Sequence, residues 1–290
     1  AGETSETCDG LDNNCDGATD EGCPCGKLGV ACPDGFGCKD GNDPGEGWCV
    51  SDDAGSVWVP GGDFWMGCNV EEDDDCYGDE YTSYPDDPQH LVEVASFEID
   101  RTEVTAAAYK ACGTCTEPEF TTGGYATYDS PSTQDHPINY VDWYQSQAYC
   151  EARGAGWRLC TEAEWEKAAR GGCSLYCPEG DAACCQAAMP VYPWGDEAPT
   201  CDLTWFGACA SSTHPVGVLP GGASPYGAHD MAGNVWEWVE DWYHGDYSSA
   251  PSTGYPAWLE PSGSDRVRRG GSFDLSAANV RAGMRFVNSP

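Results

Sequence analysis

The fold is decided by a stretch near the C-terminal end of the chain, which reads Arg269-Gly270-Gly271-Ser272-Phe273-Asp274-Leu275-Ser276-Ala277-Ala278-Asn279-Val280-Arg281. A second stretch accompanies it, Gly233-Asn234-Val235-Trp236-Glu237-Trp238. The chain has 19 cysteines among its 290 residues, yet the first stretch has none. Its side chains at Leu275 and Val280 are aliphatic, so they can neither ligate a soft metal nor exchange electrons.

Further motifs follow one another along residues 57–290. They include Pro60-Gly61-Gly62, Asp100-Arg101-Thr102-Glu103-Val104-Thr105, His136-Pro137, Arg158-Leu159-Cys160-Thr161-Glu162-Ala163-Glu164-Trp165-Glu166 and Tyr192-Pro193-Trp194-Gly195. With the two stretches above, this series resembles the formylglycine-generating enzyme (sulfatase-modifying factor) family. The resemblance implies an α+β fold class with low regular secondary structure, an elaborated C-type-lectin-like domain. We expect a small disulfide-rich calcium-binding module before it.

Local signals predict three helices in this domain. Thr105 is a good N-cap for a helix over 106–111, and a second helix is expected over 141–152. Thr161 and Glu164 form the pattern of a capping box, in which each side chain satisfies a backbone N–H at the start of a third helix.

The resemblance also bears on activity. Active members carry two copper-binding, redox-active cysteines at the positions of Leu275 and Val280, so it implies a scaffold without that reaction. We therefore expect no enzyme activity and no copper. The alternative is a formylglycine-generating-type oxidase with relocated cysteines, which requires a close, solvent-reachable cysteine pair in a pocket beside Ser272 and Trp236.

A structural calcium site is implied by the resemblance at the Trp-Glu-Trp segment. Its ligands are expected to be the carboxylates of Asp230 and Glu237 and the carbonyls of Gly233 and Val235. Hard oxygen donors at close spacing suit calcium. The alternative is that Glu237 only hydrogen-bonds backbone groups.

A second calcium site is predicted near the N-terminus from the residues themselves. Acidic and amide side chains at alternate positions, followed by a glycine, are typical of calcium-binding loops. The expected ligands are Asp12, Asn14, Asp16, Ala18 and Asp20. The alternative is an acidic, disulfide-stapled tail without a specific ion.

Composition divides the chain into four parts: the calcium-binding motif at 1–24, a small two-disulfide module at 25–50, a linker at 51–56 and the family-like domain at 57–290. A zinc site is the less favoured alternative for the module's cysteines. The cysteines expected to form disulfides are Cys8, Cys15, Cys25, Cys32, Cys38, Cys49, Cys68, Cys76, Cys150, Cys160, Cys201 and Cys209. Cys160 is the expected new partner of Cys150. An odd total leaves at least one cysteine free, metal-bound or paired with another chain.

Charge and cysteine content limit partners and location. A formal net charge of −36 makes nucleic acid and anionic membranes poor partners, because phosphate binding needs clustered Lys and Arg. No run of about 18 apolar residues is present, so no membrane span is expected. Frequent cysteines, and a start at Ala1 without a signal region, indicate a mature product that is secreted, extracellular or on the cell surface.

These observations favour a non-catalytic, calcium-binding protein that serves binding or structural assembly. Its partners are expected to be other protein chains, including copies of itself. The remaining alternative is a lectin-like binder of sugar or peptide. Its loop at 273–281 would then present Asp274, Asn279 and Arg281 to the ligand.

Overall fold

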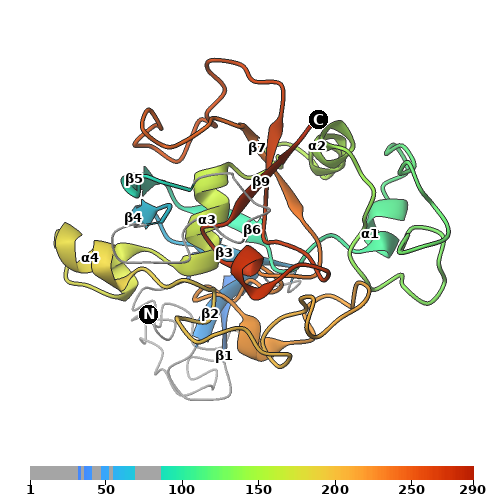
Figure 1. The fold of residues 1–290 in the computed structure, drawn as a ribbon, viewed down its shortest axis with the longest axis horizontal. Helices are drawn as coiled ribbons and strands as arrows, with labels where there is room; N and C mark the ends of the chain where they lie inside the picture. Colours follow the sequence, from blue (N-terminus) through green and yellow to red (C-terminus); the bar gives the residue numbers. More distant parts are fainter. Residues whose placement is uncertain (1–31, 34–35, 41–46, 52–54, 69–85) are drawn as a thin grey trace, which may run out of the picture.

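The computed structural model describes residues 32–33, 36–40, 47–51, 55–68 and 86–290 (Figure 1). The predicted calcium motif at 1–24 lies outside the described residues, as do Cys8, Cys15, Cys25 and Cys76. Within the described part, no helix is long and apolar enough to cross a membrane.

The first sheet is antiparallel and has the strand order β1-β2-β3-β6. Its strands are β1 (Phe36–Asp40), β2 (Gly47–Ser51), β3 (Ser56–Val59) and β6 (Phe97–Asp100). Val50 of β2 lies opposite Val57 of β3, and both are fully buried in the core. Among the described strands, β6 pairs with β3 alone and is the last strand of this sheet.

Two further sheets complete the strands of the described region. β4 (Gly62–Met66) and β5 (His90–Val94) form a two-stranded antiparallel sheet. β7 (Glu237–Trp242), β8 (Arg266–Arg269) and β9 (Arg285–Asn288) form an antiparallel sheet in the order β7-β8-β9. The Arg-Gly-Gly-Ser motif therefore begins at the last residue of β8.

The helices are short, which agrees with the low regular secondary structure expected. They are α1 (Ala106–Lys110), α2 (Trp143–Ala152), α3 (Glu162–Arg170) and α4 (Ala182–Ala188). Within the described residues, 3₁₀ turns lie at Cys173–Leu175, Pro220–Gly222 and Ala277–Val280. The predicted N-cap at Thr105 and the capping box of Thr161 and Glu164 are confirmed.

The helix α3 lies at the centre of the molecule, between the β4–β5 sheet and the β7–β8–β9 sheet (Figure 1). Its Trp165 and Glu166 are fully buried. Burial opposes the charge of Glu166, but Arg269 and Arg170 outweigh burial and lower its pKa. The arginine of the Arg-Gly-Gly-Ser motif is thus a core residue that anchors the central helix.

Five disulfides are complete within the described residues. They are Cys32–Cys49, Cys112–Cys115, Cys173–Cys185, Cys177–Cys184 and Cys201–Cys209. Cys201 and Cys209, both expected to form disulfides, are bonded to each other, and Cys68 is also disulfide-bonded.

The bridge expected between Cys150 and Cys160 is wrong, because both cysteines are free. Cys150 is fixed in the last turn of α2. The backbone of Cys160 is held by a hydrogen bond of 2.9 Å from the Glu240 N–H to its carbonyl. Separate elements therefore fix the backbones of the two cysteines. Their side chains line a common pocket but do not form a disulfide.

Candidate functional site

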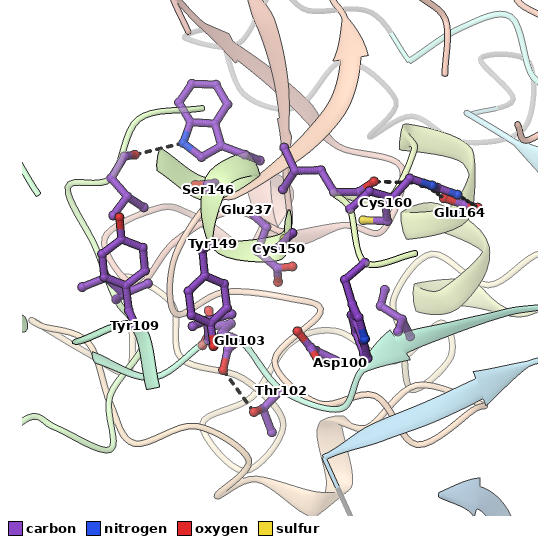
Figure 2. Close-up of a pocket in the computed structure, with 18 of the residues that line it drawn as sticks. Asp100, Thr102, Glu103, Tyr109, Ser146, Tyr149, Cys150, Cys160, Glu164 and Glu237 are labelled. Carbon is purple, nitrogen blue, oxygen red and sulfur yellow. Dashed lines mark hydrogen bonds and ion pairs between the residues drawn. The ribbon is translucent and has the colours of Figure 1, made fainter. Parts of the chain in front are cut away.

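A pocket of about 460 Å³ lies between β6, α2 and the start of β7 (Figure 2). All four residues of β6 line it, together with the loop before α3. Two thiols, Cys150 and Cys160, face it alongside acidic and aromatic side chains. Its size is within the range of about 300–1,000 Å³ that is usual for ligand sites.

The thiols differ from the other described cysteines. Every other cysteine whose side chain is described is disulfide-bonded, whereas Cys150 and Cys160 are free. Burial, with Asp100 nearby, raises the pKa of the Cys150 thiol to about 11. Burial also raises the pKa of Cys160 well above its ordinary value, helped by Glu164 and Glu237. Both thiols are therefore protonated at neutral pH.

One buried carboxylate, Glu103, connects the pocket to the Gly-Asn-Val-Trp stretch. It accepts hydrogen bonds from Asn234 Nδ2 at 2.6 Å and from the Val235 N–H at 3.0 Å. Burial raises its pKa, and the neighbouring carboxylates of Asp230 and Glu237 raise it further. The motif residue Glu103 therefore holds the second stretch in place through the Asn234 side chain and the Val235 backbone.

Asp230 and Glu237 are the other two members of this acidic group. Burial raises the pKa of Asp230 to about 6 and that of Glu237 to about 8. The Gly217 N–H donates to Asp230 at 2.6 Å, and the indole N–H of Trp165 donates to Glu237 at 2.9 Å. Neither carboxylate forms an ion pair with a described residue.

Comparison with known proteins gives the family. The profile of the Sulfatase-modifying factor enzyme 1-like domain matches residues 47–290. The chain belongs to the sulfatase-modifying factor family. This result confirms the resemblance noted in the sequence.

Named relatives of this family member are enzymes. The chain is 32% identical to the formylglycine-generating enzyme of Streptomyces coelicolor over 295 residues, covering 81% of this chain and 85% of that one. It is 33% identical over 238 residues to hercynine oxygenase of Mycolicibacterium thermoresistibile, covering 70% of this chain but only 50% of that protein. The solved structure of PvdO from Pseudomonas aeruginosa superposes with a TM-score of 0.58 at 25% identity, covering 83% of this chain and 89% of PvdO.

The expectation of a non-catalytic protein is therefore wrong at the level of the family, because the relatives are named as enzymes. That expectation rested on the aliphatic Leu275 and Val280. The aliphatic residues show only that this stretch has no thiols. The described structure has two free thiols on other elements. The relocated-cysteine alternative is the hypothesis that the comparisons support.

The Arg-Gly-Gly-Ser stretch of this family member is mostly interior. Val280 is fully buried in a cluster with Tyr192, Phe206 and Ala232. Leu275 is half-buried, and neither aliphatic chain offers a donor to copper. The residues at these two positions do not fit copper, and its absence from the protein remains a prediction.

The ligand surface predicted at 273–281 is wrong for two of its three residues. Asn279 is buried and donates to Ser276 Oγ at 2.9 Å. Arg281 is buried and forms an ion pair with Asp86 at 3.4 Å. Long polar side chains become interior when another segment supplies their partners. Only Asp274 is exposed.

The chemistry of the acidic group fits a hard cation. Asp230 and Glu237 are half-buried carboxylates without a cationic partner among the described residues, and calcium prefers such oxygen donors. The described region has no cluster of three or more His, Cys, Asp or Glu side chains arranged around a metal. Backbone carbonyls, expected here from Gly233 and Val235, would have to complete the shell. Calcium therefore remains a prediction.

Sequence reasoning missed the shared pocket of Cys150 and Cys160. One signal was available, because an odd number of cysteines requires at least one without an intrachain partner. The signal does not say which cysteine is free. The role of Glu103 was also missed, although it lies in a motif that was noted.

Proposed function

We propose that the chain is an oxidase-type enzyme of the sulfatase-modifying factor family, with Cys150 and Cys160 as its reacting groups. The observation that carries the proposal is that the two free cysteines line one pocket. The enzyme names of its relatives support the reaction class. Because those matches cover only part of some relatives, substrate and partners are part of the proposal.

The reaction balances as a thiol oxidation. A disulfide between Cys150 and Cys160 accepts two electrons and two protons from two substrate thiols, which become joined by a new S–S bond. Dioxygen then takes two electrons and two protons from the enzyme dithiol and leaves as hydrogen peroxide. The protonated state of both thiols makes the free dithiol slow to react at neutral pH, since the thiolate is the nucleophile.

Serine substitution tests this assignment. Purified protein is incubated with dithiothreitol, and dioxygen uptake and hydrogen peroxide release are measured. Cys150→Ser and Cys160→Ser should each abolish both signals. Ser146→Ala is the matched control, because Ser146 lies one turn before Cys150 on α2 and lines the same pocket. Undiminished uptake in the serine variants would refute the role of the thiols.

Calcium at Asp230 and Glu237 is a structural part of the proposal. A divalent cation would offset the burial that raises both pKa values and would hold the irregular segment before β7. Removing calcium with a chelator should lower the melting temperature, and added calcium should restore it. In Glu237→Gln the chelator should have a smaller effect, whereas an unchanged melting curve in the wild type would exclude the ion.

Export is also proposed for this chain. The disulfides support it, since they persist in oxidising compartments. In such a compartment, two unbonded thiols facing one pocket are an exception among the described cysteines. Partners are expected among other polypeptides.

A further inference from the structure

One exposed aromatic residue, Tyr140, has a strained backbone. Its φ is +58°, in the left-handed region that bulky side chains rarely adopt. Asp230 and Asn234 share this conformation, but short Asp and Asn side chains tolerate it, and hydrogen bonds to other segments hold both of them. The Tyr140 hydroxyl makes no hydrogen bond to a described residue, and the side chain is 42% exposed. Strained residues of this kind cluster at functional sites.

The ring of Tyr140 lies against a second exposed ring. Phe120 is 51% exposed, and the two ring centres are 5.2 Å apart at an interplanar angle of 71°. These two rings form an aromatic platform between α1 and α2 (Figure 1). Tyr125, 52% exposed, is joined to the same segment by a hydrogen bond of 2.7 Å from the Asn139 side chain to its carbonyl. Three of the eight most exposed large apolar side chains of the described chain therefore fall within residues 120–140.

Hydrogen bonds hold the two segments of the platform side by side. The Glu119 N–H donates to the Tyr140 carbonyl at 3.3 Å, and Gln145 Nε2 donates to the Glu117 carbonyl at 2.7 Å. Gln145 also belongs to the capping box of α2, whose N-cap is Asp142. The rings are therefore presented on a backbone that is anchored to the start of a helix. A preorganised surface of this kind has less ordering entropy to lose when a ligand binds.

The charge around the platform is negative. The sequence has no Lys or Arg between Lys110 and Arg153, and both of these are paired with carboxylates. Glu117 and Glu119 precede Phe120, are exposed, and form no ion pair with a described residue. The faces of aromatic rings attract cations, and so do unpaired carboxylates. Rings and charge therefore favour the same kind of ligand.

We propose that Phe120 and Tyr140 bind an arginine side chain from a basic segment of a second polypeptide. A planar guanidinium stacks on an aromatic face and pairs with carboxylates through two hydrogen bonds, whereas the ammonium of lysine is a compact, strongly hydrated charge. A neutral sugar ring would also stack on these rings, but it would gain nothing from the surrounding negative charge. The site goes beyond the proposed function, because it uses neither Cys150 nor Cys160.

The test is binding of the acetylated, amidated peptide Gly-Arg-Gly-Arg-Gly to the whole chain. Isothermal titration calorimetry is carried out in about 0.15 M salt, where long-range attraction is screened beyond about 8 Å. A matched peptide replaces arginine by citrulline, which has nearly the same shape but no charge. The wild type should bind the arginine peptide and should not bind the citrulline peptide.

Substitutions locate the bound peptide. Phe120→Ala and Tyr140→Asn should each weaken binding about two- to fivefold, the effect of losing one exposed cation–π contact. The double variant should lose about fivefold or more. Tyr255→Ala is the matched control and should bind like the wild type. Tyr255 is 55% exposed, but the guanidinium of Arg158 already lies over its ring, 4.4 Å from the ring centre.

The variant Tyr140→Asn also separates binding from a structural role. Asn adopts the left-handed conformation more readily than Tyr, so this variant should melt at the wild-type temperature or above it while it loses affinity. A tyrosine that serves packing alone predicts the opposite pair of results, a lower melting temperature with unchanged affinity.

Four results would overturn the proposal. The first three are no binding of the arginine peptide, equal affinity for the citrulline peptide, and unchanged affinity in the Phe120→Ala/Tyr140→Asn variant. The last of these would mean that the acidic surface attracts cations without using the rings. The fourth is binding of the neutral oligosaccharide cellohexaose that is lost in the double variant while the arginine peptide still binds, because the platform would then belong to a carbohydrate.

Discussion

Replacing Arg269 by methionine should lower the free energy of unfolding by about 3–5 kcal/mol, the usual cost of breaking a buried ion pair. Arg269 is fully buried and pairs with the equally buried Glu166. It also donates to the carbonyls of Gly283 at 2.6 Å and Met284 at 3.0 Å. Its guanidinium lies 5.3 Å from the centre of the Trp165 ring.

The magnitude follows from what the substitution leaves behind. Glu166 would keep Arg170 at 2.9 Å and the Gly67 N–H at 2.7 Å, but it would lose its second cation. Two buried carbonyls would lose their donor, and each unpaired buried acceptor costs about 1–3 kcal/mol. Methionine recovers part of this loss because it fills similar apolar volume.

Urea unfolding with the disulfides intact measures the loss. Arg153→Met is the matched control, since Arg153 pairs with Asp100 near the surface, where both side chains are about 30% exposed. That pair should contribute about 0–1 kcal/mol. A loss below about 1.5 kcal/mol in Arg269→Met, or equal losses in the two variants, would refute the reasoning that the motif arginine anchors α3.

Three other predictions follow from the same structure. Because its pKa is raised to about 11, Cys150 should react with iodoacetamide about tenfold faster for each pH unit between 7 and 10, as followed by mass spectrometry; a plateau near pH 9 would contradict its burial. Burial raises the pKa of Asp241 from its ordinary value of 3.8 to about 7, so the wild type should lose stability relative to Asp241→Asn as pH rises from about 4 to 7; parallel urea-unfolding curves across that range would contradict this. Gly222→Ala should destabilise strongly, because a Cβ would lie 1.8 Å from the Leu203 carbonyl oxygen, whereas Gly245→Ala has open space; equal melting temperatures would contradict it.

Local rules predicted the helix starts well. The capping box of Thr161 and Glu164 depends on atoms within one turn of α3, so four residues of sequence contain the whole signal. The same is true of Thr105 before α1. These features needed no knowledge of the rest of the chain.

Burial of polar residues was not predictable in this way. Arg281 is interior because Asp86, 195 residues away in sequence, supplies its partner. Cys150 and Cys160 meet one pocket because α2 and the loop before α3 are brought together by packing, and the Cys160 carbonyl accepts a hydrogen bond from Glu240 of β7. Contacts of this kind depend on the whole fold, so they cannot be predicted from composition or from the spacing of residues in the sequence.

The Arg-Gly-Gly-Ser motif specifies backbone shape, and this explains how it persists without the family's cysteines. Gly271 has a φ of +79°, and a Cβ there would lie 2.4 Å from the Asn279 carbonyl oxygen. The turn therefore needs glycine whatever the side chains at Leu275 and Val280 are. Arg269 is required for the same structural reason, through Glu166. A stretch under these constraints identifies the fold reliably, while the groups that react can lie on other elements around a different pocket.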